Sequence, residues 1–183
     1  MLGNRSIFLV GPMGSGKTAV GRHLARLLAY PFFDSDQEVE QRTGADIPLI
    51  FEREGESGFR RREREVLDSL TRREGIVLAT GGGAVLDVDS RQDLRTRGWV
   101  VYLEASITQQ AARAGRTRHR PLLQGTDPLV RLEELMRGRE PLYREVADFV
   151  ISTNQRKVPA VAERIAEEYR SALAPVPGGA GAR

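Results

Sequence analysis

One short segment near the N-terminus constrains the fold of this chain more than any other feature. Residues 11–18 read GPMGSGKT, which matches the pattern Gly-x-x-x-x-Gly-Lys-Ser/Thr. This pattern acts as a phosphate loop where it joins a buried strand to the start of a helix. Residues 6–10 before it are a short apolar run typical of a buried strand, and residues 20, 24, 27 and 28 after it are apolar at the spacing of an amphipathic helix. The sequence therefore predicts a strand, a loop and a helix in that order.

The residue types of this loop suit a polyphosphate. Backbone N–H groups of a glycine-rich loop form an anion nest, and the helix N-terminus adds a partial positive charge. We expect Lys17 to reach the β- and γ-phosphates and the Thr18 hydroxyl to ligate Mg²⁺. The alternative is a glycine-rich turn that carries Lys-Thr by chance, which the flanking strand and helix disfavour. The sequence thus predicts ATP with Mg²⁺, and the expected nucleotide contacts are Gly14, Ser15, Gly16, Lys17, Thr18 and Ala19.

The rest of the chain alternates short apolar runs with helical periodicity. Residues 32–33, 76–79, 99–103 and 149–151 are the further candidate strands. Five short strands alternating with helices predict an α/β fold of the P-loop NTPase type, in which helices cover both faces of a five-stranded parallel sheet. We expect one P-loop domain over residues 1–173, with a mobile lid at about 115–127. Residues 174–183, rich in Pro, Gly and Ala, are expected to be disordered.

Helix boundaries can be predicted at four places. Gly44 should end a helix over residues 37–42, and Gly55 should end a short helical segment that begins at Ile47. Ser106, with Gln109 three residues on, has the spacing of a capping box. Residues 128–146 are helical in pattern, with an expected break near Pro141.

Composition excludes several classes of protein. Cysteine is absent from the 183 residues, which excludes disulfides, thiolate metal sites and cysteine nucleophiles. No apolar run approaches the roughly 20 residues of a membrane helix, and no signal-peptide pattern is present. We expect a cytoplasmic protein without membrane contact. Lys and Arg number 28 against 25 Asp and Glu, which fits either a preference for anionic ligands or an Arg-rich composition without functional meaning.

Among nucleotide-binding classes, a small-molecule kinase fits best. No guanine-reading Asn-Lys-x-Asp segment occurs, and residues 76–79 lead into Thr80 and three glycines rather than into the Asp of a motor ATPase. Asp34 and Asp36 are two apart at a strand's carboxyl end, so both can face the edge where ligands bind. One carboxylate can take a proton from the acceptor hydroxyl while the other holds Mg²⁺ waters. Helix capping is the alternative for either.

Three other segments leave alternatives open. Residues 60–62 are consecutive arginines, which either include a bidentate carboxylate binder or form a solvated basic face. Residues 81–83 are consecutive glycines, which either pack backbone N–H groups against a ligand or form a flexible turn. Residues 115–127 contain Arg116, Arg118, His119 and Arg120, which belong either to a lid that closes over ATP or to a basic surface loop.

Taken together, these segments resemble the shikimate kinase family over residues 7–169. The matching segments are residues 11–18, 33–36, 59–61, 81–85, 120–123, 139–143 and 153–154. The resemblance implies transfer of the γ-phosphoryl group of MgATP to the 3-hydroxyl of shikimate. It also implies that Gly58, where a larger or acidic residue would be expected, is a departure from the family pattern.

The resemblance assigns roles to individual residues. Asp36 is implied to contact the acceptor hydroxyl and take its proton, with Asp34 and Thr18 on the metal side. Lys17 and Arg120 are implied to neutralise charge on the phosphates. The shikimate contacts implied besides Asp36 are Arg60, Arg139, Gly82 and Gly83, and the arginines implied on the adenine side are Arg113 and Arg156.

Two rivals predict other behaviour. A kinase for another small hydroxy acid, such as gluconate, would share the nucleotide half of the site. A nucleic-acid-binding regulator that uses ATP as a switch would explain the arginine runs, but the chain lacks interleaved aromatic and basic residues. We expect no nucleic-acid partner and a monomer.

Overall fold

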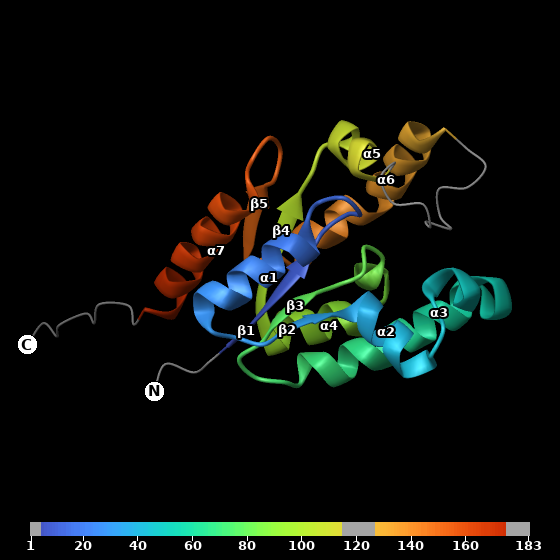
Figure 1. Cartoon of the computed structure of the whole chain (residues 1–183), viewed down its shortest axis with the longest axis horizontal. Coiled ribbons are helices and arrows are strands. Elements are labelled where there is room, and N and C mark those ends of the chain that lie inside the picture. Colours follow the sequence, from blue (N-terminus) through green and yellow to red (C-terminus); the bar gives the residue numbers. More distant parts are fainter. Residues whose placement is uncertain (1–4, 115–126, 175–183) are drawn as a thin grey trace, which may run out of the picture.

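The computed structural model describes residues 5–114 and 127–174 of the chain (Figure 1). The elements, in chain order, are β1 (Ser6–Val10), α1 (Lys17–Leu28), β2 (Phe32–Asp34), α2 (Ser35–Thr43), α3 (Ile47–Thr71), β3 (Val77–Ala79), the 3-10 turn η1 (Ala84–Leu86), α4 (Val88–Arg97), β4 (Gly98–Glu104), α5 (Ile107–Ala114), α6 (Pro128–Val146), β5 (Phe149–Ser152) and α7 (Val158–Leu173). The expected lid, apart from Asp127, lies outside the described residues. So does the expected tail, apart from Ala174.

The strands form one parallel sheet in the order β2-β3-β1-β4-β5, which confirms the predicted fold class. The central strand β1 pairs with β3 and β4, so that Ile7 lies opposite both Val77 and Trp99. β3 pairs in turn with β2. Because the strands are parallel, the loops after β1, β2 and β3 leave the sheet at the same edge. The phosphate loop, Asp34 and the three glycines are thereby brought together.

Helices cover both faces of the sheet (Figure 1). Successive residues of β1 point to opposite faces: Ile7 and Leu9 belong to a core packed against α1 and α7, while Phe8 and Val10 belong to one packed against α3, α4 and α6. This alternation explains why the strand reads as an unbroken apolar run. No helix in the described ranges is long and apolar enough to span a membrane.

Glycines end or interrupt helices where the sequence predicted. Gly44, with φ of 65°, caps the C-terminus of α2. Gly55 has φ of 69° and ψ of −176°, so it kinks α3 while the hydrogen-bonded helix continues on both sides. α2 begins at Ser35, two residues earlier than predicted, because the Asp34 side chain caps its first turn.

The predicted break near Pro141 is wrong. α6 runs without interruption through Pro141, although proline removes one backbone N–H donor. One face of the helix buries Leu132, Met136 and Tyr143 on either side of the proline. Packing of this continuous apolar face outweighs the lost hydrogen bond, so the tertiary context keeps the helix whole.

The predicted capping box at the start of α5 is half formed. The Ser106 Oγ accepts from the Gln109 N–H at 3.2 Å, as expected. The Gln109 amide does not return to Ser106 but donates to Thr153, and Asn154 Oδ1 accepts from the Ser106 N–H at 2.9 Å. The β5–α7 turn thus supplies the second half of the cap, which ties α5 to the end of β5.

Gly98 offers a test of packing at the centre of the sheet. A Cβ on Gly98 would lie 2.3–2.7 Å from three ring atoms of the fully buried Phe8. We expect Gly98→Ala to lower the free energy of unfolding by about 1–3 kcal/mol through overpacking. Gly138→Ala is the control, since a Cβ there meets nothing within 4 Å, and we expect it to stabilise α6 by about 0.5–1 kcal/mol. Chemical denaturation measures both, and equal stabilities for the two variants would contradict the packing argument.

Candidate active site

The phosphate loop has the backbone that its glycines predict. Gly14 and Gly16 have φ of 75° and 90°, a left-handed region that favours glycine. Gly16 is the N-cap of α1, so the helix N-terminus points into the loop. The Lys17 Nζ donates to the carbonyls of Gly11 at 2.7 Å and Pro12 at 2.8 Å, which holds the ammonium over the loop. A cation, a helix terminus and loop N–H groups converge here, as an anionic ligand requires.

The hydroxyl of Thr18 and the carboxylate of Asp34 meet beside the loop. Thr18 Oγ1 donates to Asp34 Oδ2 at 2.7 Å. The other oxygen, Oδ1, accepts from the N–H groups of Asp36 at 3.1 Å and Gln37 at 3.4 Å. Asp34 therefore caps α2, one of the two roles that the sequence left as alternatives, and its other oxygen lies next to Thr18.

These two oxygens fit a magnesium ion that keeps most of its ligands from water and phosphate. Mg²⁺ in nucleotide sites takes one or two protein oxygens and completes its octahedron otherwise. The described residues contain no group of three or more His, Cys, Asp or Glu able to hold a metal without such help. The donor set agrees with a metal that arrives with the nucleotide.

Two buried carboxylates face each other across Gly81. A Cβ on Gly81 would lie 2.4 Å from Glu63 Oε1 and 2.7 Å from Asp36 Oδ1, so a side chain there would displace both carboxylates. Both oxygens are buried and accept no hydrogen bond within the described residues. Burial, together with the charges of Glu63 and Asp34, raises the pKa of Asp36 to about 7, against the opposing effect of Lys17 and Arg60. Burial also raises the pKa of Glu63, against the opposing charge of Arg60.

The sequence analysis missed Glu63. It lies one turn after Arg60 on α3 and is 3% exposed. Arg60 Nη1 donates to Glu63 Oε2 at 2.7 Å, and Nη2 donates to Glu56 Oε1 at 3.0 Å. The guanidinium is thus held by carboxylates on both sides. The spacing of Arg60 and Glu63 at i and i+3 was the available signal, but it is common on exposed helix faces.

The glycine loop is hydrogen-bonded to two neighbouring elements. The Gly81 N–H donates to Ser35 Oγ at 2.9 Å, and the Gly82 carbonyl accepts from the Tyr143 hydroxyl. Within the described residues, the N–H groups of Gly82 and Gly83 have no hydrogen-bond acceptor, and both glycines line the cavity described below.

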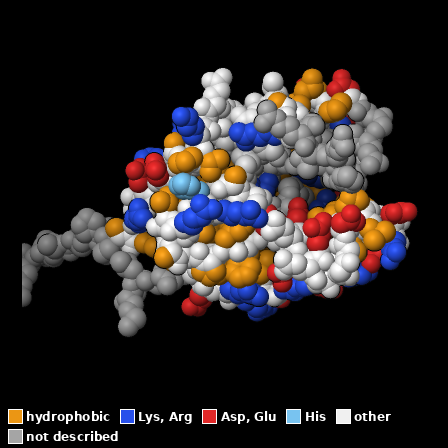
Figure 2. Space-filling view, viewed as in Figure 1, with side chains coloured by type: hydrophobic (Ala, Val, Ile, Leu, Met, Phe, Trp, Pro, Cys, Tyr) orange, Lys and Arg blue, Asp and Glu red, His pale blue; other side chains and the backbone are white. Residues whose placement is uncertain are grey.

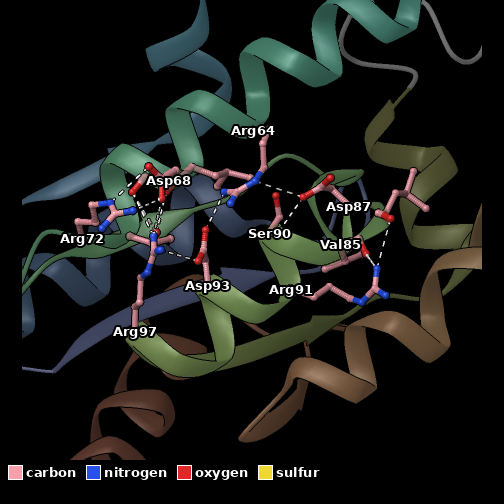
Figure 3. Close-up of polar contacts among 12 residues, drawn as sticks. Arg64, Asp68, Arg72, Val85, Asp87, Ser90, Arg91, Asp93 and Arg97 are labelled. Atoms are coloured by element: carbon pink, nitrogen blue, oxygen red, sulfur yellow. Dashed lines mark hydrogen bonds and ion pairs between the residues drawn. The ribbon is translucent and has the colours of Figure 1, made fainter.

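An ionic network behind the glycine loop supports it (Figure 3). Arg64 of α3 pairs with Asp93 of α4 at 2.7 Å. Arg91 of α4 donates to the Val85 carbonyl at 2.8 Å. Because η1 follows Gly83 directly, these contacts connect the end of the loop to α4 and α3, the helix that carries Arg60 and Glu63.

A cavity of about 610 Å³ joins the loop, the carboxylates and the glycines. Figure 2 shows it as a hollow with basic side chains inside and acidic ones on its rim. Arg139 enters it from α6, is 5% exposed, and lies beside Gly82. Four apolar residues of α3 contribute to the cavity wall: Ile47, Pro48, Phe51 and Phe59. The expected residues that line the cavity are Gly14, Gly16, Lys17, Thr18, Ala19, Asp34, Asp36, Arg60, Gly82, Gly83 and Arg139.

Other expected residues lie elsewhere. The Ser15 side chain is buried under the loop, and Arg113 Nη1 donates to the Gly14 carbonyl at 2.8 Å. Arg156 is exposed on the turn between β5 and α7 and does not line the cavity. Arg120, with the rest of residues 115–126, lies outside the described residues.

The parallel sheet, the phosphate loop and a carboxylate-lined cavity beside it define a P-loop phosphotransferase with a small-molecule acceptor. The family model for "Shikimate kinase" matches residues 13–170. The chain belongs to the shikimate kinase family.

Individual relatives agree with this assignment. A shikimate kinase from Methylococcus capsulatus is 54% identical over 169 residues, which cover 92% of this chain and 94% of the relative. A solved shikimate kinase from Acinetobacter baumannii, in complex with shikimate, superposes with a TM-score of 0.90 at 52% identity and covers 92% of this chain and 94% of its own. A gluconokinase from Sinorhizobium meliloti shares the fold alone, with a TM-score of 0.55 and 20% identity.

The raised pKa of Asp36 predicts how stability depends on pH. The pKa of Asp36 is about 7 in the folded protein against 3.8 for the unperturbed group, so folding opposes ionisation of this carboxyl. The free-energy cost of burying the ionised carboxyl is absent below pH 3.8, where the group is protonated in both the folded and the unfolded protein. It grows between pH 3.8 and about 7 and is complete above about 7. We expect Asp36→Asn to raise the free energy of unfolding at about pH 8 by a few kcal/mol, since each pKa unit is worth about 1.4 kcal/mol, and to change it little near pH 4. Urea denaturation of the ligand-free protein measures this, and a pH-independent difference would contradict it.

Proposed function

We propose that this protein transfers the γ-phosphoryl group of MgATP to the 3-hydroxyl of shikimate, giving shikimate 3-phosphate and ADP. The observation that carries the proposal is the position of Asp36, whose buried carboxylate lines the same cavity as the phosphate loop, Gly82 and Arg139. A phosphoryl donor and a hydroxyl acceptor can therefore meet at one carboxylate. Membership of the shikimate kinase family supports the choice of acceptor.

The nucleotide half of the site binds the triphosphate. The loop N–H groups of residues 14–19 and the Lys17 ammonium hold the β- and γ-phosphates. Thr18 and Asp34, whose oxygens lie side by side, would hold Mg²⁺, which would supply positive charge for the phosphate oxygens. Arg113, beside Gly14, and Arg156 belong on the adenine side. Arg120, which lies outside the described residues, is the proposed source of further positive charge at the transferring group.

The acceptor half binds a small carboxylic acid. Arg139 and Arg60 clamp the shikimate carboxylate, and the N–H groups of Gly82 and Gly83 donate to the acceptor. Because Arg60 is already held by Glu63 and Glu56, its guanidinium is pre-oriented before the acceptor enters. The apolar wall that includes Phe59 excludes water from the ring.

Asp36 orients the 3-hydroxyl and takes its proton. As the bond between that oxygen and the γ-phosphorus forms, the bond from the γ-phosphorus to the β–γ bridging oxygen breaks, and ADP leaves with the electron pair. General-base catalysis is most efficient when the pKa of the base lies near the pH of the reaction. The pKa of Asp36, about 7, therefore suits a base that acts near neutral pH. Positioning and electrostatics supply the remaining stabilisation of the transition state.

The proposal extends to the domain, the cellular location and the partners of the protein. Residues 1–173 form one kinase domain, and the protein acts in the cytoplasm as a monomer on shikimate and ATP, without a nucleic-acid partner.

An ADP-release assay across shikimate, gluconate and other hydroxy acids tests the identity of the acceptor. Turnover with gluconate and none with shikimate would overturn the proposal.

Asp36→Asn tests the catalytic base. Asparagine keeps the shape of the side chain but cannot take the proton, so we expect kcat to fall by about 10²–10⁴-fold. The Kd of ATP, measured by titration, should stay within about twofold because the phosphate loop is unchanged. Near-full activity in the variant would exclude Asp36 as the base.

Arg139→Ala tests the carboxylate clamp. Loss of a charged hydrogen-bonding partner should raise the shikimate KM by about tenfold to a hundredfold, while the KM of ATP changes by less than about threefold. Arg137→Ala, two residues away on the exposed side of α6, is the control and should leave both constants unchanged. Equal effects of Arg139→Ala on the two KM values would argue against a clamp.

A further inference from the structure

The apolar wall of the acceptor cavity comes from a short arm, residues 47–54, at the start of α3. Three of its residues, Ile47, Pro48 and Phe51, line the cavity. The Asp46 and Glu40 side chains anchor its beginning, by accepting from the N–H groups of Leu49 and Ile47 at 3.0 Å each. The Gly55 kink separates the arm from the rest of α3, so its far end needs a tether of its own.

Glu54, the last residue of the arm, supplies that tether across the kink. Its carboxylate accepts two hydrogen bonds from Arg62, from Nη2 at 2.6 Å and from Nε at 3.0 Å. Arg61 adds a longer ion pair at 3.7 Å. The hydrogen bond from Arg62 is the main cause that lowers the pKa of Glu54, which keeps the carboxylate charged. This two-bond geometry fixes direction as well as distance.

Gly58 makes the crossing possible. A Cβ on Gly58 would lie 2.4 Å from Glu54 Cβ and 2.9 Å from Glu54 Oε2. The residue has helical backbone, so its lack of a side chain is needed for space and not for conformation. This gives a physical reason for the glycine that departs from the expected pattern.

We propose that the Glu54–Arg62 pair, crossing the helix over Gly58, is a positioning device that sets the acceptor-side wall and thereby the affinity for the acceptor. This inference rests on the proposed function. Neither Glu54, Gly58 nor Arg62 lines the cavity, so they act through the arm. Phe51 of the arm packs on Phe59 with ring centroids 4.9 Å apart, and Phe59 precedes Arg60. A shift of the arm therefore changes the acceptor side of the cavity. The phosphate loop joins β1 to α1, so the same shift should leave ATP binding unchanged.

Three variants test the device by different means. Glu54→Gln removes the charge, Gly58→Ala inserts a methyl group under Glu54 without changing any charge, and Glu54→Arg with Arg62→Glu exchanges the partners. An exposed ion pair changes an equilibrium constant by up to about fivefold, and a bidentate pair changes it by more. We therefore expect Glu54→Gln and Gly58→Ala each to raise the shikimate KM by about threefold to tenfold. The KM of ATP should stay within about twofold, and the exchange should restore at least part of the loss.

Matched controls separate this role from general stability. Gly138→Ala adds a methyl group that meets nothing within 4 Å, and Glu168→Gln removes an exposed partner of Arg164 on α7. Both should leave the two KM values unchanged, and the thermal midpoint of every variant is measured alongside. Unchanged shikimate KM in Glu54→Gln and Gly58→Ala, or equal rises in both KM values, would overturn the proposal. Absence of shikimate turnover in the unmodified protein would instead overturn the proposed function, so the two failures are distinguishable.

Discussion

Parallel pairing of β3 with both β1 and β2 is the constraint on which the rest of this molecule depends. It brings three loops to one edge of the sheet, and each loop contributes a different chemical group. The loop after β1 offers N–H groups and Lys17, the end of β2 offers Asp34 and Asp36, and the loop after β3 offers the glycines. Hydrogen bonds then join neighbours directly, from Thr18 to Asp34 and from the Gly81 N–H to Ser35. The active site is thus assembled by the same backbone bonds that form the sheet.

The site concentrates charge that the fold does not fully compensate. Asp36 and Glu63 each bury an oxygen that accepts no hydrogen bond within the described part of the chain. Such groups cost stability, because a buried oxygen loses its hydrogen bonds to water. The same burial raises the pKa of Asp36 to about 7. In the mechanism that we propose, the stability lost here gives the site a basic carboxylate.

Sequence reasoning succeeded where a local pattern has one physical meaning. The phosphate loop, the alternation of strands and helices, and the helix end at Gly44 are of this kind, because backbone conformation and burial follow from a few adjacent residues. It failed at Pro141, where packing along a whole helix face outweighs one lost hydrogen bond. It left capping and metal binding as alternatives at Asp34, where the structure shows the cap and places the second carboxylate oxygen next to Thr18. It missed Glu63, since an acidic residue one turn from an arginine is common on exposed helices.

The sequence by itself determined the nucleotide half of the site, the class of fold and, through its resemblance to a family, the chemistry expected of it. These depend on residues that are close in the chain, so their spacing carries the information. The tertiary structure alone decided the strand order, the approach of Glu63 and Asp36 across Gly81, the burial of Arg139 beside Gly82, and the crossing of Glu54 over Gly58. Strand pairing and helix packing set most of these contacts between distant segments. The Glu54–Arg62 pair that crosses Gly58 joins residues close in the chain, but it spans the kink at Gly55. No rule of residue spacing specifies the direction of that kink.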